Sequence, residues 1–320
     1  MNSIFYGLKD SRARDIISRS IADIKNSKID LASFSFNHDP SFEIPQGQCK
    51  ILILWEPSAV MPWQYQERNL RNFDLVIPMS CWRAENLDIK KYAFHPYDFE
   101  SAKRVSPFTP RVRKIVMINS AKYSAGRTSY YGLRRRTSRY LHEKHNLNYS
   151  LYGNGWQMSK VMEIRKRGAS LRNSLIAREK ISLRELTSDI FYSYPEYSGW
   201  IEDKFEILSQ FEISLVIENE SDWITEKVFD SLVAGAVPLY IGPDLSEKFP
   251  KLNSCLLLAD PNPESIYKRI VEVSENELEE KRYAIDSFLD DNSQEGIGFW
   301  SHANQWTRVA NIARNYLESL

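Results

Sequence analysis

The sequence predicts an α/β protein with two domains, each built around a parallel sheet covered by helices. Short apolar runs of strand length alternate with segments of helical periodicity, which is the pattern of successive strand–helix–strand units. The 320 residues suffice for two domains of ordinary size, and a hydrophobic fraction of 42% is ample for packed cores. No internal repeat or low-complexity tract indicates another architecture.

The first domain is predicted at residues 1–108. A helix is predicted from Ser11 to Ser27, because its isoleucines fall on one stripe. A buried strand is predicted from Lys50 to Trp55, where the residues are apolar, and a second strand from Asp74 to Met79. Between them, a polar helix is predicted from Tyr65 to Asn72. Three prolines and few apolar repeats between residues 94 and 110 mark the boundary to the next domain.

The second domain is predicted at residues 109–290, and residues 291–320 form a C-terminal segment. Residues 157–198 contain helical stretches such as Arg172 to Lys180, but their connections cannot be drawn from the pattern. The expected strands are Arg113 to Asn119, Tyr149 to Tyr152, Glu212 to Ile217 and Val237 to Ile241, and the expected helices are Leu133 to Lys144, Glu226 to Ala234, Ser265 to Val273, Glu277 to Leu289 and the closing Phe299 to Leu317.

Composition narrows the class of function. Forty-two basic residues balance forty-two acidic ones, so the global field favours neither nucleic acid nor an anionic membrane as the main partner. Cys49, Cys81 and Cys255 are odd in number and lack metal-ligand spacing, which fits a reducing compartment. No run of about 18 apolar residues occurs. We therefore expect a cytoplasmic protein without a transmembrane segment, for which peripheral contact with the inner face of a membrane stays open.

The junction between residues 211 and 243 is the strongest functional signal. Its pattern predicts a strand, a loop, a helix and a second strand. Thr225 is placed to cap the start of the helix, and Gly235 lies at the end of the helix. Loops at the carboxyl ends of parallel strands bind ligands, and a helix start favours an anion. Lys227 adds a positive charge there. Since neither a glycine-rich phosphate loop nor the metal-binding tripeptide Asp-x-Asp occurs, side chains and helix starts should supply the positive charge.

This segment, IENESDWITEKVFDSLVAGAVPLYIGP, resembles the donor-binding signature of the α-1,3-fucosyltransferases of glycosyltransferase family 10. The similarity extends to residues 199–204 (GWIEDK), 152–155 (YGNG), 119–120 and 131–136, and weakens before Lys50. It implies a GT-B fold, two Rossmann-like domains facing a central cleft, with the last helix crossing back to the first domain. Animal members carry an N-terminal membrane anchor, so its absence here favours either a bacterial-type member or a soluble form of an anchored one.

The resemblance also implies the reaction: inverting, metal-independent transfer of L-fucose from GDP-β-L-fucose to a glycan hydroxyl in an α-1,3/4-type linkage, with lipopolysaccharide or another surface oligosaccharide as the expected acceptor. Arg134 matches the arginine that contacts the diphosphate, although Arg135 and Arg136 leave its register open. The other donor-side residues implied are Glu226 for the ribose hydroxyls, Lys227 for the diphosphate, Asn219 and Trp223 beside the donor, Glu218 for the fucose or the loop, Thr225, and Lys204 in the lead-in.

Glu56 is the candidate catalytic base. It follows the apolar strand that ends at Trp55, so it should stand at a carboxyl end, and it matches the catalytic glutamate of the family. His38 and His95 are alternative bases, although a lone histidine is more often structural. Three other functions stay open: a transferase for another GDP-sugar, a donor-binding protein without catalysis, and a nucleic-acid binder that uses Arg134 to Arg136.

Overall fold

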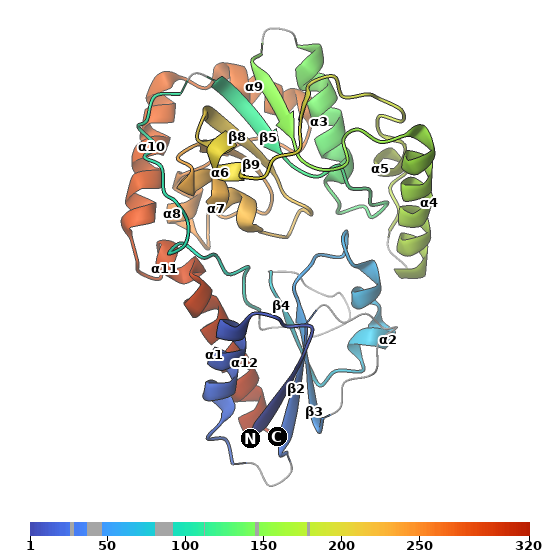
Figure 1. The fold of residues 1–320 in the computed structure, drawn as a ribbon, viewed down its shortest axis with the longest axis vertical. Helices are drawn as coiled ribbons and strands as arrows, with labels where there is room; N and C mark the ends of the chain where they lie inside the picture. The colour runs from blue at the N-terminus through green and yellow to red at the C-terminus, as the bar shows by residue number, and fades with distance from the viewer. Residues whose placement is uncertain (26–28, 37–46, 81–91, 112, 145–146, 178–179) are drawn as a thin grey trace. The chain divides into compact units, whose positions relative to one another are not determined.

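The computed structural model describes residues 1–25, 29–36, 47–80, 92–111, 113–144, 147–177 and 180–320. The chain divides into two compact units (Figure 1). The first consists chiefly of Met1–Tyr97 and Trp300–Leu320, and the second consists chiefly of Asp98–Leu175 and Glu179–Phe299. The change between units therefore falls after Tyr97 and again after Phe299, where the sequence analysis places boundaries after 108 and 290.

The first unit is built on a parallel sheet of four strands in the order β1-β2-β3-β4. Helix α1 (Ser11–Ile21) turns Ala13, Ile17 and Ile21 inward and packs against α12 (His302–Glu318). The two helix starts are joined by a hydrogen bond of 2.6 Å between His302 Nε2 and the Asp10 carboxylate. The strands are β1 (Asn2–Tyr6), β2 (Leu31–Phe36), β3 (Cys49–Leu54) and β4 (Leu75–Pro78).

Several first-unit elements differ from the prediction. Strands β1 and β2 had not been predicted, and the helix expected to Ser27 ends at Ile21. The expected helix at 65–72 is a 3-10 turn, η1 (Pro62–Tyr65), followed by α2 (Glu67–Leu70). The expected closing helix is split into α11 (Ile297–Trp300) and α12, because Ser301 has extended backbone and its hydroxyl accepts a hydrogen bond from the Asn304 N–H, capping α12.

The second unit holds a parallel sheet of six strands in the order β10-β9-β8-β5-β6-β7. The chain runs outward from β5 to β6 and β7, then returns to the other side of β5 to begin β8. This reversal of strand order between β5 and β8 is the place where open parallel sheets bind ligands. The strands are β5 (Arg113–Ile118), β6 (Tyr149–Tyr152), β7 (Tyr197–Gly199), β8 (Phe211–Ile217), β9 (Val237–Ile241) and β10 (Leu257–Leu258).

Helices cover this second sheet. Helix α7 (Glu226–Val233) packs on β8 and β9, and Gly235 follows it with a φ of 71°, a backbone conformation that glycine adopts without strain. The other helices are α3 (Tyr131–Glu143), α4 (Lys160–Ala177), α5 (Leu183–Thr187), α6 (Lys204–Leu208), α8 (Pro250–Ser254), α9 (Pro263–Glu272) and α10 (Glu275–Asp290). The predicted strands of this unit are confirmed to within two residues, whereas β7, β10, α5, α6, α8 and residues 160–171 of α4 had not been predicted. The predicted α/β class with parallel sheets and two Rossmann-like domains is confirmed.

Candidate functional site

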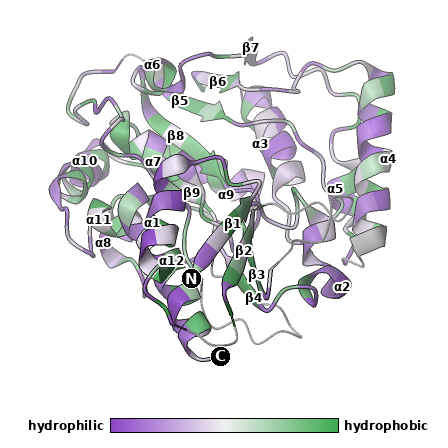
Figure 2. Cartoon of the chain, turned by 60° about the horizontal axis from the view of Figure 1, so that its bottom comes forward, coloured by the Kyte–Doolittle hydropathy of each residue, from purple (hydrophilic) through white to green (hydrophobic). Residues whose placement is uncertain are grey.

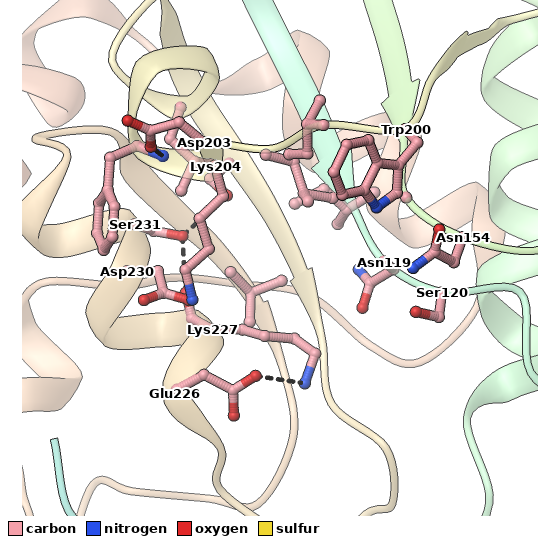
Figure 3. Close-up of a pocket in the computed structure, with 18 of the residues that line it drawn as sticks. Asn119, Ser120, Asn154, Trp200, Asp203, Lys204, Glu226, Lys227, Asp230 and Ser231 are labelled. Carbon is pink, nitrogen blue, oxygen red and sulfur yellow. Dashed lines mark hydrogen bonds and ion pairs between the residues drawn. The ribbon is translucent and has the colours of Figure 1, made fainter.

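A cavity of about 510 Å³ opens at the carboxyl ends of the central strands in the second unit (Figure 3). Its walls come from the ends of β5 and β6, the segment after β7, β8, and the first turns of α6 and α7. Gly153 permits this arrangement, because a Cβ there would lie 2.2 Å from the Asn119 carbonyl oxygen. The polar lining residues are Asn119, Ser120, Asn154, Glu202, Asp203, Lys204, Ser214, Glu226, Lys227, Asp230 and Ser231.

A buried carboxylate holds the start of α7. Glu218, directly after β8, is fully buried and accepts hydrogen bonds from the Thr225 N–H at 3.0 Å and the Thr225 hydroxyl at 2.6 Å. Thr225 stands at the predicted N-cap position, but its hydroxyl does not accept from the helix. The expected side-chain cap is therefore wrong, because the carboxylate is a stronger acceptor and orients the hydroxyl away from the helix. The first turn of α7 therefore receives no hydrogen bond from the side chain of its N-cap residue.

Lys227 completes this helix start. Its Nζ donates to the Thr225 hydroxyl at 2.8 Å and lies 3.9 Å from Glu218 and 3.8 Å from Glu226. Burial raises the pKa of Glu218, and the nearby Lys227 cation opposes that rise. The cation, the helix dipole and the uncapped N–H groups together give this wall of the cavity a positive character that suits an anion.

The three consecutive arginines of α3 have different partners. Arg134 is 2% exposed and donates from Nε and Nη2 to the Ile217 carbonyl, and from Nη2 to the Asn219 side chain at 2.9 Å. Arg135 and Arg136 instead bond to Glu185 on α5. Burial lowers the pKa of Arg134, but a guanidinium keeps its charge at neutral pH. Only Arg134 is held beside the loop that follows β8.

Two of the remaining donor-side residues line the cavity. Glu226 is half exposed, and its carboxylate lies on the cavity wall beside Lys227 (Figure 3). Lys204 begins α6 and pairs with Asp230 on α7, with 2.5 Å between Nζ and the carboxylate. The pair ties α6 to α7, so Lys204 acts in this structure as a support of the wall as well as a lining residue.

Trp223 does not reach the cavity. Its side chain is fully buried, and its indole nitrogen has no hydrogen-bond partner among the described residues. It offers no surface to a ligand in this structure, so the structure gives no support to the donor contact predicted for it. Its place in the segment between β8 and α7 makes it a packing residue of the loop.

Two residues with no predicted role, Trp200 and Asn119, lie at the cavity. Trp200 lines it and is 62% exposed, which is unusual for so large an apolar side chain. Asn119 is 4% exposed, and neither its amide nitrogen nor its amide oxygen has a partner among the described residues. Both belong to segments that resemble the family, but a single sequence does not show which of their residues face inward.

Glu56 lies in the first unit, two residues beyond the end of β3, as predicted. It is half-buried, and its backbone carbonyl accepts a hydrogen bond of 2.6 Å from the Tyr65 hydroxyl. The alternative base His95 packs against the Trp55 ring at 4.1 Å and bonds through Nε2 to the Trp55 carbonyl, which fits a structural role. His38 and Cys81 lie outside the described residues.

No group of three or more His, Cys, Asp or Glu residues in the described part of the chain is arranged to hold a metal ion. Cys49 and Cys255 are buried free thiols, and burial raises the pKa of each to about 12, so both are unreactive. Among the helices that the structure describes, none is both long and apolar enough to cross a membrane.

Comparisons with known proteins give a short sequence match and a distant fold match. No protein-family model matches the chain. The chain is 51% identical over 49 residues to the "Putative fucosyltransferase-like protein" of Arabidopsis thaliana, which is 15% of this chain and 10% of that protein. The chain therefore matches only about a tenth of the length of this relative.

A glycosyltransferase from Rickettsia africae has a similar fold, with a TM-score of 0.50 and 10% identity over 100% of this chain and 85% of that one. The trehalose-6-phosphate synthase OtsA gives a TM-score of 0.49 and 12% identity over 96% and 76% of the two chains. The likeness to the Rickettsia protein shows a shared fold, which agrees with the predicted GT-B class of two Rossmann-like domains.

Proposed function

We propose that the protein is a glycosyltransferase that uses a nucleoside diphosphate sugar, and specifically that it transfers L-fucose from GDP-β-L-fucose to a glycan hydroxyl. One observation carries the proposal: the cavity at the β5–β8 reversal is bounded by an uncapped helix start with Lys227 and Glu226 on its first turn. The match to a fucosyltransferase-like protein, and the fold shared with a glycosyltransferase, support it.

The leaving diphosphate would bind at the start of α7. Cleavage of the bond between sugar and phosphate releases negative charge on the phosphate oxygen, and fixed positive groups that face this charge lower the barrier. Lys227 supplies a full charge and the first-turn N–H groups supply directed donors. Arg134 holds the β8 end and Asn219 beside them, so it acts chiefly as a positioning residue.

The nucleoside would occupy the part of the cavity lined by Trp200 and Asn119. The exposed Trp200 indole offers a face on which a purine can stack, and the unpaired Asn119 amide offers a donor and an acceptor to a base edge. The Glu226 carboxylate can accept hydrogen bonds from both ribose hydroxyls. This arrangement suits a nucleotide sugar better than a sugar phosphate, which has no base.

Glu56 is proposed as the base in the first unit. Its carboxylate would take the proton of the acceptor hydroxyl while that oxygen attacks the anomeric carbon from the face opposite the diphosphate, which inverts the configuration. The acceptor site is proposed in the same unit. We further propose that the reaction needs no metal ion, because the α7 start provides the charge.

The nucleic-acid alternative has little support in the structure. Arg134 and Arg135 are 2% and 0% exposed, and the Arg136 side chain is paired with Glu185 at 2.9 Å. A cluster whose charges point into the protein cannot form the exposed cationic patch that a phosphate backbone requires.

Donor binding and transfer are tested separately. Isothermal titration with GDP should show that Lys227→Ala weakens binding by about 10²-fold and Trp200→Ala by about tenfold, whereas Lys268→Ala on the exposed face of α9 should bind as the wild type does. Equal binding by all three variants would place the nucleotide elsewhere. Binding that appears only with Mg²⁺ and is lost with EDTA would overturn the metal-independent proposal.

Transfer of labelled sugar from GDP-fucose and from GDP-mannose to a glycan array identifies the donor and the acceptor. Glu56→Gln should lower the transfer rate by about 10²–10⁴-fold while leaving GDP affinity unchanged. A wild-type rate in this variant would remove Glu56 as the base, and transfer of mannose alone would make the protein a transferase for another GDP-sugar. GDP binding without any transfer would indicate a donor-binding protein.

A further inference from the structure

Helix α4 is inverted relative to an ordinary surface helix. The side chains that it turns toward the protein are polar, because Glu163, Arg167, Ser170 and Ser174 are each less than 9% exposed. The ion pair between Arg167 and Glu163, together with hydrogen bonds from Arg167 to the carbonyls of Leu186 and Ser188, satisfies the charged groups of this inner side. A surface helix normally places apolar residues there.

The outward side of α4 is apolar along one line. Val161 and Ile164 are 61% and 58% exposed, Leu175 is 60% exposed, and residues 161, 164, 168, 171 and 175 repeat at intervals of three and four. Such residues share one helix face. At the middle of the line is Gly168, where an added Cβ would meet nothing within 4 Å, so this face is open.

The apolar surface continues onto the neighbouring segment. Phe191 is 45% exposed, lies with its ring 5.5 Å from the Lys160 ammonium, and donates its N–H to Glu163 at 3.3 Å, which fixes it at the first turn of α4. Its φ of 61° is a left-handed conformation that costs energy for a residue with a side chain. Of the fourteen large apolar residues exposed in the described part of the chain, seven lie between residues 161 and 191: Val161, Met162, Ile164, Leu175, Leu183, Ile190 and Phe191.

Among the residues from 160 to 191 that the structure describes, the exposed charges are all positive. The described acidic residues between 160 and 191 have buried side chains: Glu163 is paired with Arg167, Glu185 with Arg136, and Asp189 with Arg139. The exposed cations are Lys160, Arg165, Lys166, Arg172, Lys180 and Arg184. A chain with zero net charge therefore presents a locally cationic and apolar surface. Figure 2 shows hydrophilic and hydrophobic residues side by side along α4.

We propose that the outer face of α4, with Phe191, binds the surface of an anionic lipid bilayer. Exposed Val, Met, Ile and Phe side chains can enter the boundary between headgroups and acyl chains, while Lys and Arg side chains extend to the anionic headgroups. The apolar side chains and the cations are both needed for tight and selective binding. A polybasic patch binds a bilayer weakly without apolar contact, and a neutral apolar patch does not select anionic lipid.

A second copy of the chain is the less suitable occupant. Pairing of two α4 helices along the apolar line would bring Arg165 and Arg172, which flank this line, close to the same residues of the other copy, and like charges there oppose association. Phe191 lies beside the start of this line, against the first turn of α4, which makes the apolar area broader than one helix seam. A broad, cationic and apolar area suits a bilayer.

The test is co-sedimentation of the full chain with vesicles of phosphatidylcholine alone and of phosphatidylcholine mixed with phosphatidylglycerol. Binding is expected only to the anionic vesicles and should decrease as salt is raised. The double variant Val161→Ser/Ile164→Ser should bind roughly tenfold or more weakly, and Arg165→Gln/Arg172→Gln should lose roughly fivefold for each cation. The matched control is Lys268→Gln/Val271→Ser on α9, where both side chains are also exposed, and it should bind as the wild type does.

Two results would overturn the proposal. One is equal sedimentation with neutral and anionic vesicles, or none with either. The other is a concentration-dependent dimer of the wild type that becomes monomeric in Val161→Ser/Ile164→Ser, which would make the face a protein interface. The proposal stands apart from the proposed transferase function, because GDP titration and transfer to a soluble acceptor should be unchanged in every α4 variant.

Discussion

The interior of the second unit and the outer face of α4 depart from the usual distribution of residues in opposite directions. Beside β8, the fully buried Glu218 and the almost fully buried Arg134 are ionisable groups in a place where apolar side chains are expected. On α4, Val161 and Ile164 are exposed where charges are expected. The buried groups are stabilised by hydrogen bonds and ion pairs within the chain, whereas the exposed side chains are largely open to solvent. Buried ionisable groups with partners inside the protein therefore indicate a preorganised binding site. An exposed apolar patch instead indicates a surface that binds another molecule.

The largest effect is expected at the inner side of α4. Arg167→Met would leave Glu163 buried without its cation and two carbonyls without their donor, which should lower the free energy of unfolding by about 4 kcal/mol. Urea denaturation measures this loss. Arg172→Met on the exposed side of the same helix is the matched control and should change stability by less than about 0.5 kcal/mol. Similar losses in both variants would mean that α4 is not inverted.

Arg134→Met should cost somewhat less stability, about 3 kcal/mol, because it removes donors from the Ile217 carbonyl and the Asn219 side chain but leaves no unpaired ion. It should also weaken GDP binding, since the loop after β8 loses its support. Arg134→Lys keeps the charge but not the geometry, and comparing it with Arg134→Met by denaturation and GDP titration separates the two contributions. Unchanged GDP affinity in both variants would limit Arg134 to the fold.

Glu218 should make stability depend on pH. Burial raises its pKa above the ordinary value of 4.5, so the folded protein binds this proton more tightly than the unfolded chain does. Protonation then stabilises the fold, and that contribution disappears as the pH rises from 4.5 through the folded pKa. Relative to Glu218→Gln, the wild type should therefore lose unfolding free energy across that interval, as followed by denaturation at a series of pH values. A constant difference between the two proteins would show that Thr225 and Lys227 offset the burial completely.

The smallest effect on stability is expected on the outer face of α4. Val161→Ser should change the free energy of unfolding by less than about 0.5 kcal/mol, because its side chain is already 61% exposed. Thermal denaturation compares it with Val228→Ser on α7, where the side chain is fully buried and about 2 kcal/mol or more should be lost. A large loss at Val161 would mean that this face is packed within the protein.

Local pattern determined the α/β class and most elements of the second unit. The runs that became β8 and β9 are short and mostly apolar, and α7 between them has a clear apolar stripe, so the period and length of these patterns predicted all three elements. β1 and β2 were missed because short mixed segments such as Asn2–Tyr6 have no decisive pattern, and they form strands through pairing with residues far along the chain. The inversion of α4 was also hidden, since its polar side is stabilised by α5 and by the loop that follows α5.

The sequence by itself determined that a cation, a carboxylate and a helix start meet at Thr225–Lys227, because these residues are adjacent in the chain. Only the tertiary structure decided that Glu218 orients Thr225, that Arg134 rather than Arg135 supports the site, that Trp223 is buried and that Trp200 faces the cavity. Covalent neighbours are fixed by the order of residues, but partners 83 and 85 positions apart, as Arg134 is from Ile217 and Asn219, are selected by the packing of the whole sheet.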